Sequence, residues 1–276
     1  MKKKNQKSIE ENLLEFERII GNCDWVLADF DKIYLNDIKP TADSPYMFNY
    51  FHWITNFKKM CIEHKSGVKK MLGYEEETFS LEKCFSIIHP NFRPFVLEYS
   101  KNTYEMLKTP KYKTLSNKAH FSIQFPILRA DGEYILVQMN VSIIMVDNIG
   151  SPLINYNRFE VLGKYFDTPI FIKPRINFRT GIDLSEKAKE AEAELSGKVR
   201  HFLLNHLGFT DKELEVLKCL GNDLRLTDIS DKLNIPSVET IKKHNLNIIK
   251  KARIHLSPLF ANARDIAKYL KGMGII

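Results

Sequence analysis

The stretch FTDKELEVLKCLGNDLRLTDISDKLNIPSVETIKKHNLNIIKKARI, residues 209–254, has the spacing of three short helices, of which the last is basic. Thr210 and Glu213 predict the first helix because they form a capping box, in which each side chain accepts the other residue's backbone N–H. This helix should begin near Asp211. It should end where residues 221–223, Gly-Asn-Asp, interrupt the apolar pattern.

A short turn separates the second predicted helix from the third. Residues 227–233 place Ile229 and Leu233 four positions apart, as an amphipathic helix does. Residues 234–236, Asn-Ile-Pro, favour a turn, and Ser237 is a good N-cap for a helix that starts directly after it.

The third predicted helix has two different faces. Residues 240–253 include five Lys or Arg and no acid, which suits the major groove of DNA, where cations meet phosphates and long side chains reach base edges. A basic face that is merely solvated is the competing interpretation, and the helix-turn-helix spacing favours DNA. At about 100° per residue, the apolar face contains Val238, Ile241, Ile248 and Ala252 with Ile249 at its edge, and the opposite face contains Glu239, Lys242, Lys243, Leu246, Asn247 and Lys250.

Residues 209–276 resemble the LuxR/GerE-type helix-turn-helix domain. The matching positions are ELEVL at 213–217, Asp228, Ile229 and Leu233 in the second helix, Thr240, Ile241, Lys242, His244, Asn247, Ile248 and Lys251 in the third, and the closing LKGMGII at 270–276. The resemblance implies an all-α domain of four helices that binds double-stranded DNA.

The same resemblance implies which side chains contact DNA. Leu246 would meet a thymine methyl group. The alternative is that Leu246 and His244 pack on neighbouring residues. The expected base contacts are Lys242, Lys243 and Leu246, and the expected phosphate contacts are Ser237, Thr240, His244, Asn247, Lys250 and Lys251.

Three positions depart from this family pattern. Arg225 stands where the family has a Ser or Thr cap for the second helix, so Thr227 is expected to cap it instead. Pro236 is an extra residue in the turn, and residues 253–263 form a longer link to the fourth helix. Because the groove-facing lysines remain, DNA binding is still expected.

The front of the chain is predicted to be mixed α/β, with short helices followed by three antiparallel strands. Asp131-Gly132 separates two long β-rich runs and is a strong hairpin signal, because both residues tolerate positive φ. A second turn is expected at residues 147–152. Such a sheet should have one face covered by helices or by another subunit.

This region resembles a PAS domain. The similar segments are Gly67 with MLGYEEETF at 71–79, IIHPNFRPFV at 87–96 and RADGEYILV at 129–137. The resemblance implies a sheet and helices around a small pocket that holds a ligand, a haem or a flavin, or that is empty while the domain serves in dimerisation. Residues 53–64 match poorly, and residues 157–167 look inserted before a last strand, TPIFI, at 168–172.

Candidate pocket residues are Phe121, Phe125, Tyr134 and Met139, which are equally suited to an ordinary core. His89 is expected to pack or face solvent rather than bind haem. The cysteines, at 23, 61, 84 and 219, form no close pair, and no histidine pair has ligand spacing, so no metal or other cofactor is expected.

Composition limits the class of protein. The net charge of +7 agrees with an acidic polymer as partner. No apolar run reaches the ~20 residues of a membrane helix and no signal peptide is evident, so a cytoplasmic protein without membrane association is expected. The chain has no Gly-rich phosphate loop, nucleophile elbow or helix with paired histidines, which argues against an enzyme.

The predicted architecture is α+β, a PAS-like antiparallel sheet with flanking helices followed by an all-α four-helix domain. Its parts are an N-terminal helical segment at 1–44, a PAS-like sensor domain at 45–180, a linker helix at 181–205 and the DNA-binding domain at 206–276. The linker has an apolar stripe at Leu184, Ala188, Ala191, Leu195, Val199 and Phe202, and the N-terminal segment has one at Ile9, Leu13, Phe16 and Ile20.

Each of these stripes is covered either by its own domain or by a second subunit. A homodimer would place two recognition helices about 34 Å apart, one turn of DNA. We therefore expect a sequence-specific transcriptional regulator whose PAS-like domain senses a small molecule or a partner and alters the dimer geometry. The alternative is a DNA-binding protein whose PAS-like domain serves protein interaction or dimerisation without a ligand.

Overall fold

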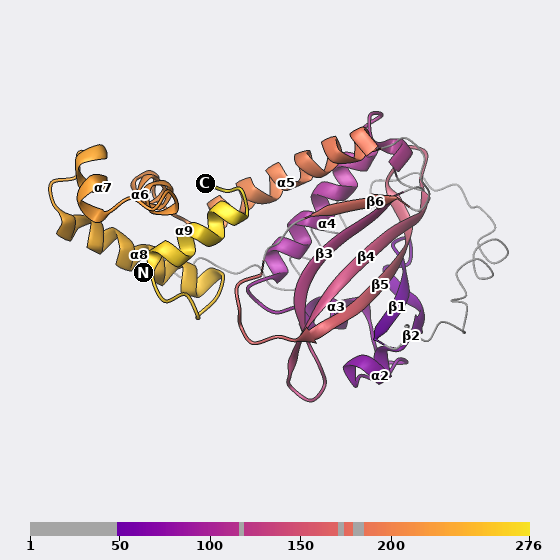
Figure 1. Cartoon of the computed structure of the whole chain (residues 1–276). Coiled ribbons are helices and arrows are strands. Elements are labelled where there is room, and N and C mark those ends of the chain that lie inside the picture. The colour runs from indigo at the N-terminus through magenta and orange to yellow at the C-terminus, as the bar shows by residue number, and fades with distance from the viewer. Residues whose placement is uncertain (1–48, 116–118, 171–173, 179–184) are drawn as a thin grey trace.

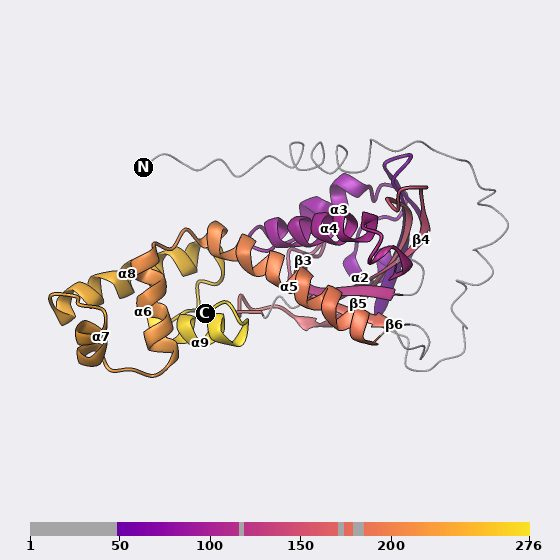
Figure 2. The same cartoon turned by 90° about the horizontal axis from the view of Figure 1, so that it is seen from above.

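The structure, a computed structural model, describes residues 49–115, 119–170, 174–178 and 185–276. The predicted N-terminal helical segment at 1–44 lies outside these residues. The described chain has two parts, a sheet with flanking helices and a C-terminal group of helices (Figure 1). A long helix, α5, runs from the first part to the second, as the view from above also shows (Figure 2).

One sheet of six strands forms the front part, in the order β2-β1-β5-β4-β3-β6. All neighbouring strands in it are antiparallel. The three consecutive antiparallel strands predicted from the sequence are therefore confirmed as β3, β4 and β5. The strands are β1 (Tyr50–Asn56), β2 (Cys61–Ser66), β3 (Ala119–Leu128), β4 (Tyr134–Val146), β5 (Pro152–Lys164) and β6 (Arg175–Phe178).

The predicted hairpin between β3 and β4 is confirmed. Gly132 has φ of 86°, and the backbone N–H of Arg129 donates to the carbonyl of Glu133 at 2.8 Å, which closes the turn. At the second predicted turn, the carboxylate of Asp147 accepts the backbone N–H groups of Ile149 and Ser151. These side-chain bonds add to the backbone hydrogen bond from the Asp147 N–H to the Ser151 carbonyl at 2.9 Å, which closes the β4–β5 turn.

The end of the sheet differs from the prediction. Residues 157–164 are part of β5 and are not inserted, because residues 157–160 pair with both β1 and β4 and the strand then continues along β4 to Lys164. Gly163 lies next to a register shift opposite Leu136, and such a bulge lets the strand continue through a glycine. The last strand is β6, so the prediction of a strand at 168–172 was wrong for residues 168–170; residues 171 and 172 lie outside the described part.

Helices cover one face of this sheet (Figure 1). The inward side chains of β3 to β5 are buried and share a single core with α4, and Phe125, Val137 and Phe159 are at most 2% exposed. The Trp53 and Phe159 rings are 4.3 Å apart. The helices of this part are α2 (Val68–Leu72), α3 (Leu81–Ile87), α4 (Arg93–Lys108) and the short 3-10 helix η1 (Lys113–Leu115).

Helix α5 (Ser185–Leu207) packs along α4 through one apolar stripe. The stripe is buried within the single chain, so its own domain covers it, which is one of the two alternatives that the sequence left open. Its members are Ala188, Ala191, Leu195, Val199, Leu203 and Leu207, none more than 5% exposed, whereas Phe202 is half-buried. None of the helices in the described ranges is both long and apolar enough to cross a membrane.

Four helices follow α5. Thr210 and Glu213 form the predicted capping box of the first, and Ser237 caps the third by accepting the backbone N–H of Thr240 at 3.3 Å, so both cap predictions are confirmed. Asn262 caps the fourth. The helices are α6 (Asp211–Gly221), α7 (Leu226–Lys232), α8 (Val238–His255) and α9 (Ala263–Gly272).

The start of α7 corrects the sequence analysis. Arg225, and not Thr227, occupies the N-cap position, and the carboxylate of Asp228 accepts the backbone N–H of Arg225 at 3.3 Å. The Arg225 side chain has no acceptor for the first backbone N–H groups of the helix, and the Asp228 contact is the other half of a capping box, in which the side chain reaches back to the N-cap.

Candidate functional site

Helix α8 is the first candidate site, and its own residues explain its length. Ser237 caps it, and no Gly or Pro interrupts it until Pro258 follows its end. Ile241, Ile248 and Ala252 are fully buried, which fixes the apolar side toward the neighbouring helices α6 and α9. The opposite side therefore faces outward.

Four of the expected DNA contacts share this outward side. Lys243, Asn247 and Lys250 are exposed, and Leu246 is 67% exposed although it is a large apolar residue. Most of the Leu246 surface is thus left uncovered by the described chain. An exposed leucine between cations has no packing role to explain it, which is consistent with an apolar contact to a ligand or partner.

The remaining expected contacts are more constrained. The Lys242 ammonium lies 2.6 Å from the Glu239 carboxylate, but both side chains are more than half exposed, and such a pair contributes only about 0–1 kcal/mol and exchanges readily. Thr240 and His244 are half-buried, whereas Ser237 is exposed. The Ser237 hydroxyl is already engaged as a helix cap.

Lys251 is the exception among the predicted phosphate contacts. Its ammonium lies 2.5 Å from the Glu213 carboxylate and donates to the Gly208 carbonyl at 2.8 Å. Glu213 is 3% exposed. Lys251 thus ties α8 to the start of α6, and its role as a phosphate contact stays a prediction.

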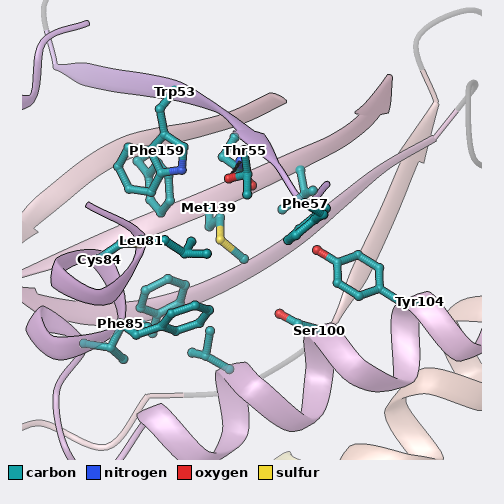
Figure 3. A pocket seen from close by; sticks show the side chains of 15 residues that line it. Trp53, Thr55, Phe57, Leu81, Cys84, Phe85, Ser100, Tyr104, Met139 and Phe159 are labelled. Carbon is teal, nitrogen blue, oxygen red and sulfur yellow. Dashed lines mark hydrogen bonds between the residues drawn. The ribbon is translucent and has the colours of Figure 1, made fainter. Parts of the chain in front are cut away.

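A cavity inside the PAS-like part is the second candidate site (Figure 3). Its volume is about 60 Å³. Apolar and aromatic side chains dominate its walls, and no charged side chain is among them. They are Trp53, Thr55, Phe57, Leu81, Cys84, Phe85, Ile88, Val96, Ser100, Tyr104, Phe125, Met139, Val141, Asn157 and Phe159.

Most polar groups at the cavity are hydrogen-bonded to one another. The Asn157 amide donates to the Thr55 hydroxyl at 2.9 Å, and the Asn155 amide donates to the Tyr104 hydroxyl at 2.8 Å. Asn155 is fully buried, and its Oδ1 has no hydrogen-bond partner among the described residues. Burial raises the pKa of the Cys84 thiol to about 12, so this thiol is neutral near pH 7.

Of the four predicted pocket residues, Phe125 and Met139 line the cavity and Phe121 and Tyr134 do not. Phe121 is buried further along β3. Tyr134 begins β4, and its ring lies 4.6 Å from that of His89, outside the cavity. The two misses have different reasons, because Phe121 faces inward away from the cavity, whereas Tyr134 alternates with the buried face of β4.

Sequence reasoning missed the contribution of β1. Trp53, Thr55 and Phe57 alternate along YFHWITNF and point into the cavity, as Figure 3 shows. Asn157 on β5 was missed as well, since its segment was interpreted as an insertion. The alternation of large apolar side chains in residues 51–57 was the signal that could have identified this strand.

Comparisons with known proteins found a family similarity in the part of the chain that contains the sheet. A comparison with curated protein sequences found no match. Among solved structures, the N-terminal domain of a diguanylate cyclase with a PAS/PAC sensor from Marinobacter aquaeolei is 16% identical and matches over 41% of this chain and 95% of its own, with a TM-score of 0.34.

Two further solved structures match over most of the chain. A phage VqmA–DPO complex is 13% identical, covering 82% of this chain and 84% of its own, and a VqmA–ligand–DNA complex from Vibrio cholera is 12% identical, covering 84% and 85%; both have TM-scores of 0.25. The family model described as PAS fold matches residues 62–155, from β2 to the first residues of β5. The chain therefore contains a PAS-like domain, which the structure describes as an antiparallel sheet with flanking helices.

Proposed function

We propose that this chain is a sequence-specific DNA-binding transcriptional regulator, with α7 and α8 as a helix-turn-helix and the PAS-like domain as its sensor. The observation that carries the proposal is the outward side of α8. It combines Lys243, Lys250 and an exposed Leu246 on a helix whose other side is fully buried. Cations for phosphates beside an apolar group for a base edge are the chemistry of major-groove recognition.

The proposed DNA contacts are those of the sequence analysis. Lys242, Lys243 and Leu246 contact bases. The phosphate contacts are Ser237, Thr240, His244, Asn247, Lys250 and Lys251, of which Lys251 also pairs with Glu213. In a homodimer, two such helices would lie about 34 Å apart on successive turns of DNA.

The cavity supports sensing of a small, uncharged molecule. Its walls offer aromatic rings and neutral hydrogen-bonding groups, and no charge that could pair with an ionised ligand.

A second function is favoured by the size of the cavity. About 60 Å³ is far below the roughly 300–1,000 Å³ typical of small-molecule sites. A PAS-like domain with so little internal space suits a protein-interaction or dimerisation module that acts without a ligand.

Alanine substitutions on α8 test DNA binding. We expect Lys243→Ala to cost about 1–3 kcal/mol on preferred duplexes and to relax base preference. Lys250→Ala should weaken binding to all duplexes alike and lower the salt dependence by about one phosphate contact. Preferred sequences would be selected from a random duplex library, and affinities measured by fluorescence anisotropy over a salt series.

Lys189→Ala is the control for these substitutions, since Lys189 is an exposed lysine on α5, outside the C-terminal helices. It should leave both affinity and salt dependence unchanged. Equal losses for Lys243→Ala and Lys250→Ala on preferred and random DNA would contradict the division of roles. Absence of salt-dependent binding by the unmodified protein would contradict DNA binding itself.

Native mass spectrometry of the protein purified from its own host separates the two sensor functions. We expect a dimer that carries a small extra mass, which disappears when the protein is denatured. A dimer of the bare chain mass would instead favour the interaction module, and a monomer would contradict the proposed dimer.

A further inference from the structure

Residues 165–170, which we term the bridging segment, leave the end of β5 and touch the C-terminal helices. The Asp167 carbonyl accepts a hydrogen bond from the Ser257 hydroxyl, and the Ile170 carbonyl accepts one from the Tyr269 hydroxyl at 2.6 Å. Ser257 is fully buried and Tyr269 is 7% exposed. The backbone of the PAS-like part is thus held directly by the C-terminal region.

Ser257 connects this contact to α8. It follows Leu256, the C-cap of α8, and its backbone N–H donates to the Ala252 carbonyl at 3.3 Å. Its hydroxyl also accepts the backbone N–H of Leu259 at 3.1 Å. A displacement of Asp167 therefore acts on the last turn of the helix proposed to bind DNA.

The other side of Asp167 faces the PAS-like core. Its carboxylate lies 3.5 Å from Nε2 of His89, whose Nδ1 accepts the backbone N–H of Asn91 at 3.3 Å. Because Nδ1 is an acceptor, Nε2 carries the proton of the neutral ring and points it at Asp167. Asp167 also has φ of 57°, a left-handed conformation that costs energy and needs surrounding contacts to hold it.

His89 in turn adjoins the cavity. Ile88, the residue before it, lines the cavity and forms a bridge with Ile127 of β3. The backbone N–H of His89 donates to the Pro126 carbonyl at 3.0 Å. One continuous set of contacts thus runs from the cavity wall through Ile88, His89, Asp167 and Ser257 to the end of α8.

Helix α5 makes the other connection between the two parts. Gly208, which has φ of 62°, directly follows the end of α5 at Leu207, and α6 begins at Asp211. Arg200 on α5 donates to the Gly274 carbonyl at 2.9 Å, and the His206 and His255 rings are 4.9 Å apart. These contacts join α5 to the C-terminal helices. The bridging segment instead joins the end of β5 and His89, beside the cavity, to the same helices.

We infer that the bridging segment conveys the occupancy of the cavity to α8, with Asp167 as its positioning residue between His89 and Ser257. The inference rests on the proposed function for its biological meaning. It goes beyond the proposed function because it assigns the route that connects the cavity to α8. Filling the cavity displaces Ile88 and His89, and Asp167 passes that displacement to the last turn of α8.

Hydrogen exchange of the full chain tests this route without any ligand or DNA. We expect Asp167→Val to speed exchange in residues 252–260 by about threefold to tenfold, because a β-branched residue opposes positive φ and removes the contact to His89. Asp167→Asn should resemble the unmodified protein, since asparagine tolerates this backbone conformation and keeps an acceptor for His89. The matched control is His64→Val, at an exposed residue of β2 with φ of 48°.

A double-mutant cycle then tests the connection to the cavity. Val141→Leu adds a methylene group at the cavity wall on β4, and Val141 belongs to neither the bridging segment nor the C-terminal helices. It should change exchange in residues 252–260 of the otherwise unmodified protein and have no effect there in the Asp167→Val background. Equal changes in both backgrounds, no change in either, or unaltered exchange in Asp167→Val would overturn the inference.

The DNA affinity of the same variants distinguishes a failure of the proposed DNA binding from a failure of the route between the cavity and α8. Asp167→Val should alter the affinity for a preferred duplex, and Asp167→Asn should restore it. If the unmodified protein binds no DNA, the proposed function fails, while the exchange experiment still decides whether the cavity and α8 are coupled.

Discussion

Replacing Lys251 with methionine should destabilise the C-terminal helices by about 3 kcal/mol, because it leaves the buried Glu213 carboxylate without its cation. Breaking one side of a buried ion pair costs about 3–5 kcal/mol. The lower end applies, since the Lys251 side chain is 30% exposed and water can enter in its place.

Substituting the other partner of this ion pair should cost less stability. Glu213→Gln keeps an acceptor for the Thr210 backbone N–H, which now donates to the carboxylate at 2.8 Å. It leaves the Lys251 ammonium with the Gly208 carbonyl and solvent, so we expect a loss of about 1 kcal/mol. The asymmetry arises because the carboxylate is buried and the ammonium is not.

Hydrogen exchange of α6 and α8 in increasing urea measures this difference in the full chain. Tryptophan fluorescence would not, because Trp25 and Trp53 both precede the C-terminal helices. Lys250→Met is the matched control, as the adjacent lysine on the same helix is exposed and should change stability by less than about 0.5 kcal/mol. Similar losses for Lys250→Met and Lys251→Met would contradict the structural role of Lys251.

The C-terminal helices could be predicted well because local signals determine them. The capping box at Thr210 and the cap at Ser237 depend on residues three apart, and the buried stripe of α8 follows from its own periodicity. The role of Lys251 could not be predicted in this way. Its partner Glu213 is 38 residues distant, and a lysine in a basic helix gives no sign that it faces inward.

The cavity was predicted only in part for a related reason. Its walls come from β1, α3, α4 and three further strands, so membership depends on how distant segments pack. Periodicity identified the inward faces of β3 and β4. It could not distinguish Phe125 at the cavity from Phe121, two positions of the same face whose difference is set by the helix opposite.

The contacts of Asp167, where the two parts of the chain meet, could not be predicted from the sequence either. Its segment was interpreted as an insertion because it departs from the PAS pattern before the expected last strand. The structure makes residues up to 164 part of β5 and places Asp167 against His89 and Ser257. Both contacts are long-range, about 80 to 90 residues apart, and neither has a local sequence signature.

Shortening Leu195 to alanine should destabilise the PAS-like part by about 2–5 kcal/mol, the cost of removing a large buried side chain without full collapse of the space it leaves. Leu195 is fully buried where α5 packs along α4 in the same chain. The loss should therefore appear in the unfolding of a single subunit. Urea unfolding followed by the fluorescence of Trp53, which lies in the same core, measures it.

Protein concentration distinguishes this packing from a subunit interface. If α4 covers the stripe, Leu195→Ala lowers the urea midpoint by the same amount at every protein concentration, because no second subunit takes part. Lys189→Ala, on the exposed side of α5, should leave the midpoint unchanged. A midpoint shift that shrinks as concentration rises would instead assign the stripe to the dimer. The proposed dimer would then be built on α5 itself, and a signal through α5 would compete with the route through Asp167.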